Sequence, residues 1–184
     1  ASEPSQSKWE QLKGGIESDV MNVQNPTPLA DLYNELDAKY DSPKNDNPDV
    51  NIDFTKNGIV ISLGSSSLFE SGAAVLKPEG RKIIYSVAKE LRRKLNKYDL
   101  IIDVEGHTDD VPMNSAMFPS NWELSSSRAA SVVKLATERG IKSKVVRAIG
   151  HADSFPIKPN RTEDGTPIPE NMAANRRVDI VVHY

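Results

Sequence analysis

The chain has 184 residues, of which 38% are hydrophobic and 27% are charged, enough for one sizeable core and a tail but not for a typical two-domain enzyme. Its net charge of -3 hides a split. Residues 1–55 hold eleven acidic and four basic side chains, a net -7, whereas residues 56–184 hold fifteen acidic and nineteen basic ones, a net +4. The absence of Cys excludes disulfides, thiolate metal sites and a Cys nucleophile.

The first part of the chain is polar. Residues 1–25 have only scattered apolar side chains, spaced as in one weak helix. A stronger helix is predicted from Pro28 to Tyr40, because apolar residues recur at i, i+3, i+4, i+7 and i+11, and Pro28 suits the first helical position. Its apolar stripe needs a partner surface, either on the compact domain or on a second copy. Turn residues fill 41–48, so we divide the chain into a polar, acidic linker at 1–48, with a helix near 28–40, and a compact domain at 49–184.

The compact domain alternates helical and strand patterns. A hairpin turning at Asn57-Gly58 comes first. After it the pattern predicts a helix over Pro78–Asn96, a strand over Leu100–Val104, a helix from the capping box Ser120–Glu123 to Gly140, and strands over Lys144–Ile149 and Arg177–His183. This order indicates an α/β fold, an α+β sandwich with a mixed sheet and helices packed on one face.

Two polar loops follow predicted strands. One starts at Glu105 and runs to the helix near Ser120, and the other covers Gly150 to Asn171. Ligand sites in α/β proteins tend to lie beyond the carboxyl ends of strands, so these loops are the first place to expect one.

Four strings in these regions carry a resemblance: Gly106-His107-Thr108-Asp109, Leu124 to Ala129, Gly150-His151-Ala152-Asp153, and Asn175-Arg176-Arg177-Val178. In this order they resemble the OmpA-like peptidoglycan-binding domain, over roughly Val50 to Tyr184. Within that superfamily, Thr108 to Pro112, Ser120 to Ser125 and Leu68 to Ala73 are most similar to the periplasmic region of the flagellar motor stator B subunit (MotB).

The resemblance implies non-covalent binding of peptidoglycan through the diaminopimelate of its peptide stem. The family's motif then assigns the ligand ammonium to Asp109 and its carboxylate to Arg128, with further contacts from Thr108, Asn121 and Arg176. It also implies a wall anchor of the flagellar stator that is no enzyme and needs no cofactor. The resemblance further implies a periplasmic homodimer. An upstream transmembrane segment, absent from this chain, is expected to anchor it in the inner membrane and to meet the stator A subunit.

The chemistry of these side chains agrees with that assignment. Arg presents a planar fork to a carboxylate, and Asp accepts several hydrogen bonds from an ammonium. Each charge-assisted hydrogen bond contributes ~1.5 to 3 kcal/mol net, so a few of them give only weak binding. Two domains on one polymeric wall would re-bind at high effective concentration, which favours an oligomeric anchor.

Other interpretations of the same residues remain open. Asp109 and Arg128 could pair with each other or with backbone, and only one of Arg176 and Arg177 is expected to face a site. Gly64 to Ser67 is expected to be a flexible loop.

Other classes of protein give alternatives to the stator anchor. A lipoprotein or outer-membrane wall tether is one, and a wall hydrolase using Asp109, Asp110 and His107 is another. No metal site is expected, because the three histidines show no paired-ligand spacing. Nucleic acid is not an expected partner, because the basic face of the 78–96 helix also carries Glu79 and Glu90 and lacks an aromatic platform.

Overall fold

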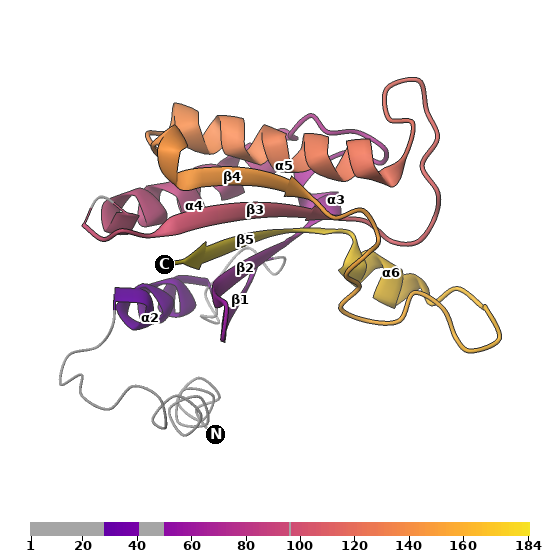
Figure 1. The fold of residues 1–184 in the computed structure, drawn as a ribbon, viewed down its shortest axis with the longest axis horizontal. Coiled ribbons are helices and arrows are strands. Elements are labelled where there is room, and N and C mark those ends of the chain that lie inside the picture. The colour runs from indigo at the N-terminus through magenta and orange to yellow at the C-terminus, as the bar shows by residue number, and fades with distance from the viewer. Residues whose placement is uncertain (1–27, 41–49, 96) are drawn as a thin grey trace.

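The computed structural model describes residues 28–40, 50–95 and 97–184 (Figure 1). The weak helix expected within residues 1–25 lies outside this part of the chain. The elements are α2 (Pro28–Tyr40), β1 (Val50–Thr55), β2 (Gly58–Gly64), α3 (Ser65–Leu68), α4 (Pro78–Leu95), β3 (Ile101–His107), α5 (Asn121–Glu138), a 3-10 turn (Ser143–Val145), β4 (Val146–Gly150), α6 (Pro169–Asn175) and β5 (Arg177–His183). None of the described helices has the length and apolar character needed to cross a membrane.

The five strands form one mixed sheet in the order β1-β2-β5-β3-β4. β3 and β4 are parallel, and every other neighbouring pair is antiparallel. α4 and α5 lie on the same side of this sheet (Figure 1). The sequence-based prediction of a mixed sheet with helices on one face is therefore confirmed.

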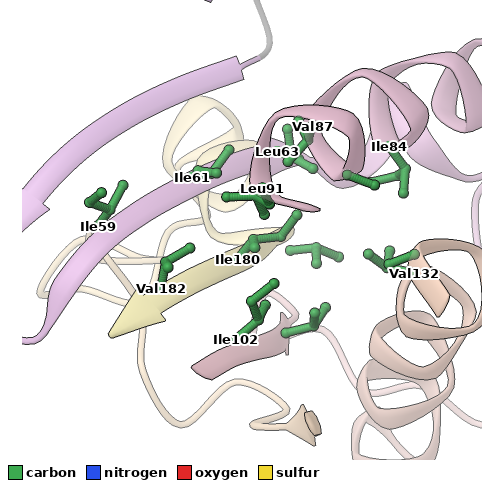
Figure 2. Close-up of a cluster of buried hydrophobic side chains, with 14 of the residues drawn as sticks. Ile59, Ile61, Leu63, Ile84, Val87, Leu91, Ile102, Val132, Ile180 and Val182 are labelled. Carbon is green, nitrogen blue, oxygen red and sulfur yellow. The ribbon is translucent and has the colours of Figure 1, made fainter. Parts of the chain in front are cut away.

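Strand alternation separates an apolar face from a polar one. Ile61, Ile180 and Val104 are paired across β2, β5 and β3, so their side chains point to the same face. This face meets α4 and α5, whose apolar stripes supply Ile84, Val87, Leu91 and Val132 to the core (Figure 2). The core therefore lies between the sheet and its helices.

The helix predicted over Pro28–Tyr40 is α2, with the predicted bounds. Its Leu32 and Leu36 are fully buried and belong to the core of the domain. The Tyr33 ring meets the Phe54 ring of β1 edge to face at 5.6 Å. The apolar stripe thus packs on this chain's own sheet, which leaves no need for a second copy at this surface. The proposed division at residues 48 and 49 stays a prediction.

Three local features differ from the sequence-based predictions. β3 continues through His107, so the first polar loop begins at Thr108. The expected flexible loop at Gly64 to Ser67 is wrong, because Ser65–Leu68 forms the single turn α3. α6 was not predicted. Both helices are too short for a readable apolar period, and α6 carries only Pro169 at its first turn as a local signal.

Removing the buried side chain of Leu36 tests the packing of α2. We expect Leu36→Ala to lower the free energy of unfolding by about 2–5 kcal/mol, because it leaves a cavity between α2 and the sheet. Asn34→Ala, at an exposed position of the same helix, is the control and should change it by less than about 0.5 kcal/mol. Urea titrations followed by circular dichroism measure both, and equal stabilities for the two variants would contradict this packing.

Candidate functional site

The five residues predicted as a site, Thr108, Asp109, Asn121, Arg128 and Arg176, all line one cavity of about 580 Å³. Its walls come from the loop after β3, the first half of α5, the start of β5 and the segment between β2 and α4. Lining residues from Ser65 to Arg176, which are far apart in the sequence, therefore meet at one end of the sheet.

Close contact between β3 and α5 brings the walls together. A Cβ atom at Gly106 would collide with the carbonyl oxygen of Ser125, and one at Gly150 would collide with Ser126. Glycine at both positions lets the ends of β3 and β4 approach the first turns of α5. Ser125 is fully buried there, and its Oγ accepts a hydrogen bond from the amide of Ala152 at 3.0 Å.

The carboxylate of Asp109 is held in a fixed orientation. Its side chain is only 10% exposed, and its Oδ2 accepts from Nη1 of Arg176 at 2.5 Å. The other oxygen, Oδ1, accepts from the amide of Val111 at 3.0 Å. Thr108 Oγ1 donates to the carbonyl oxygen of Asp109 at 2.8 Å, and this bond also holds the backbone of Asp109 in place. Arg176 is the more exposed member of the pair, with 44% of its side chain exposed.

Arg128 is buried but does not pair with Asp109. Its Nε donates to the carbonyl of Ala73 at 2.8 Å, its Nη2 to that of Glu70 at 3.3 Å, and its guanidinium lies 5.1 Å from the centre of the Phe69 ring. The pKa of Arg128 is lowered to about 10, first because burial penalises the charge and second because Arg176 is near, while Asp109 opposes the shift. At neutral pH the group is a cation whose hydrogen bonds to described residues leave Nη1 available.

The remaining predicted residues shape the rim. Asn121 Nδ2 donates to the carbonyl of Val111 at 2.9 Å, so it ties the loop after β3 to the start of α5. Arg177 lies on the other face of the sheet, where it is buried and its Nε donates to Asp179 at 3.0 Å. Of the two adjacent arginines, Arg176 lines the cavity and Arg177 does not, in the pattern that the sequence predicts.

Ser65, Phe69 and Lys77 also line the cavity, and sequence reasoning assigned no site role to them. The Oγ of Ser65 is buried without a hydrogen-bond partner among the described residues. Phe69 stands within the Leu68 to Ala73 string that carries part of the resemblance, whereas no local pattern marks Ser65 or Lys77. Together the lining includes three cations and two anions, so the cavity can meet ligand groups of both signs.

The residues of the hydrolase interpretation do not converge on the cavity. Asp110 forms an ion pair with Arg161 at 2.7 Å and does not line it. His107 points to the opposite face of β3 from Gly106 and the helices. Asp109 therefore has neither of its proposed catalytic partners at the site.

Comparison with known proteins identifies the family and the fold of this chain. The model of the OmpA family matches residues 68–168. The chain belongs to the OmpA family. This family is one of non-enzymatic binding domains, in agreement with the prediction that the chain is not an enzyme.

Two relatives come from Bacillus subtilis. The uncharacterised protein YtxE is 36% identical over 126 residues, covering 68% of this chain and 48% of the relative. Motility protein B is 33% identical over 131 residues, covering 70% of this chain and 46% of the relative. This OmpA-family chain thus spans about half the length of the curated relatives it matches.

Several solved structures share the fold of this OmpA-family chain, and three of them are compared with it. A putative MotB-like protein from Desulfovibrio vulgaris superimposes with a TM-score of 0.71 at 25% identity, covering 84% of this chain and 93% of the other. The periplasmic domain of Helicobacter pylori MotB superimposes with a TM-score of 0.62 at 28% identity, covering 72% of this chain and 80% of the other. The cell wall anchor of the Pseudomonas aeruginosa T6SS superimposes with a TM-score of 0.64 at 26% identity, covering 85% of this chain and 96% of the other.

A methyl group at Gly106 tests the close contact that builds the cavity. We expect Gly106→Ala to lower the free energy of unfolding by at least about 1–3 kcal/mol, because the backbone of Ser125 must move away. Gly64→Ala is the matched strand control, since a Cβ there meets no atom within 4 Å. Denaturant titration compares the two, and similar losses of stability would show that the Gly106 contact does not constrain α5.

Proposed function

We propose that this chain binds peptidoglycan without covalent chemistry and anchors a flagellar motor stator to the cell wall. The observation that carries the proposal is the convergence of Asp109, Arg128 and Arg176 in one cavity. Membership of the OmpA family supports it, as do relatives and solved structures named for motility protein B and for a cell wall anchor.

The ligand group we propose is the free amino acid head of meso-diaminopimelate in the peptide stem. This head is a zwitterion with one ammonium and one carboxylate. Arg128 Nη1 donates to the carboxylate, in a partly buried place where a charge-assisted hydrogen bond is strong. Arg176, whose side chain is exposed, leaves its ion pair with Asp109 and binds the ligand carboxylate, and Asp109 then binds the ammonium. Thr108 and Asn121 hold the loop in position for both contacts.

The whole protein that we infer extends beyond this chain. It lies in the periplasm and is held in the inner membrane by a transmembrane segment upstream, through which it meets the stator A subunit. We propose that two copies act together, because a single weak site holds little load. When two linked sites bind one polymer, the site that remains bound keeps the other close to the polymer, so the other re-binds quickly. The homodimer contact does not need the apolar stripe of α2, which the domain itself covers.

Neutralising the carboxylate of Asp109 tests the site, and the same change at the adjacent Asp110 serves as the comparison. We expect Asp109→Asn to weaken co-sedimentation with purified wall by about 10- to 150-fold in apparent affinity, because one charge-assisted contact to the ammonium is lost. Asp110→Asn is the matched control and should sediment like wild type, since Asp110 pairs with Arg161 outside the cavity.

Circular dichroism must first show that both proteins are folded. Unchanged sedimentation of a folded Asp109→Asn would overturn the assignment of the cavity. Release of soluble muropeptides from the wall would contradict a purely binding role.

A pair of stem peptides tests the proposed ligand group. We expect a tripeptide ending in meso-diaminopimelate to bind about 10- to 150-fold more tightly than the same tripeptide ending in L-lysine, because the lysine side chain lacks the carboxylate that Arg128 would meet. Calorimetric titration of the wild-type protein measures both affinities. Equal affinities would reject recognition of the carboxylate while leaving wall binding itself intact.

A further inference from the structure

The face of the sheet opposite α4 and α5 brings two histidines together. Gly106 of β3 is paired with Gly150 of the parallel strand β4, so the residues that follow, His107 and His151, are neighbours. Their rings stack with centroids 4.9 Å apart and an interplanar angle of 20°. They come from separate segments of the chain, and the spacing in sequence gives no sign of this contact.

Glu105 lies beside both imidazoles. One carboxylate oxygen is 3.4 Å from Nε2 of His151, and the other is 3.8 Å from Nε2 of His107. One donor atom from each of the three residues lies within 4.8 Å of the other two. Two imidazole nitrogens and a carboxylate are a ligand set that suits divalent zinc and its neighbours among the transition metals.

His107 is buried in a way that calls for a partner. It is 4% exposed, and neither ring nitrogen has a hydrogen bond within the described part of the chain. Burying such a polar group without a partner is costly, and native proteins rarely leave one unsatisfied. A bound cation would satisfy the nitrogen that faces Glu105.

The charges around the cluster favour a cation. Glu105 brings one carboxylate to the cluster, with an oxygen 3.4 Å from Nε2 of His151. Asp179 adds a second carboxylate, with Oδ2 3.6 Å from Nε2 of His107. Arg177 pairs with Asp179 at 3.0 Å and offsets part of that second charge, which leaves Glu105 as the main anionic group of the cluster.

We propose that Glu105, His107 and His151 form a binding site for a divalent transition-metal ion such as Zn²⁺, with Asp179 or water as the fourth ligand. Ligands at ~2.1 Å from a tetrahedral ion stand about 3.4 Å apart, so modest side-chain rotation closes the present arrangement. His151 and Glu105 have side chains 23% and 26% exposed, which gives the ion a path from solvent. The expectation that the chain has no metal site rested on sequence spacing and overlooked the pairing of β3 with β4.

An ion at this place would join the ends of β3 and β4 directly behind the cavity. The next residue, Thr108, donates its amide to the Ala152 carbonyl at 2.8 Å, and the amide of His151 donates to the Gly106 carbonyl at 2.9 Å. The ion would therefore stiffen the base of the loop that carries Asp109. The proposal does not depend on which ligand fills the cavity.

Equilibrium dialysis of the full chain against Zn²⁺ tests the site. We expect one equivalent to bind the wild type, and His151→Ala to bind at least about 10-fold more weakly, since loss of even a supporting group costs that much. His183→Ala is the matched control and should bind like wild type. His183 has a similar side-chain exposure, 24% against 23%, and belongs to a separate contact with Asp103 at 2.8 Å.

Glu105→Gln gives a second variant that keeps the shape of the cluster and should also weaken Zn²⁺ binding. Absence of binding by the wild type would overturn the proposal. So would equal affinities of the wild type and both cluster variants, which would place any bound Zn²⁺ elsewhere. Wall sedimentation of the same proteins, measured with and without Zn²⁺, separates failure of the metal site from failure of the proposed function.

Discussion

The close contact between the ends of β3 and β4 and the first turns of α5 is the constraint on which the site depends. It exists because Gly106 and Gly150 carry no side chain where the backbone and side chains of α5 approach. Ser125 then seals the contact, since its Oγ accepts from the amide of Ala152. Arg128 follows Ser125 by about one helical turn, so this contact sets its distance from the loop after β3.

A buried cation forms the other half of the site. Carbonyl groups of Glu70 and Ala73 and the ring of Phe69 surround Arg128, which therefore also holds the segment between β2 and α4 in place. Two neutral carbonyls reduce the cost of burying the charge but do not neutralise it. The lowered pKa of Arg128 expresses that remaining cost, and a ligand carboxylate would relieve it. The same side chain can thus be structural in the free protein and a binding group in the complex.

Much of the fold could be predicted from the sequence, because its longer elements have clear periods and caps. The hairpin at Asn57-Gly58, the helix beginning after Ser120 and the alternating strand β5 all stand close to their predicted places. The five site residues followed from the motif resemblance, and the structure brings them to one cavity. Local patterns do not encode strand order. The meeting of His107 with His151, and the covering of the α2 stripe by β1, could not be predicted for that reason.

The opposite net charges of the two parts of the chain lead to a few ion pairs at α2. Glu35 forms ion pairs with Arg93 at 2.9 Å and with Lys94 at 2.6 Å, so one acidic residue of the first part does meet the basic face of α4. The Arg93 and Glu35 side chains are 64% and 43% exposed, and such surface pairs contribute little. Full burial of Leu36 contributes more than these pairs can. Apolar packing therefore holds α2 on the domain, and the ion pairs add only a small contribution.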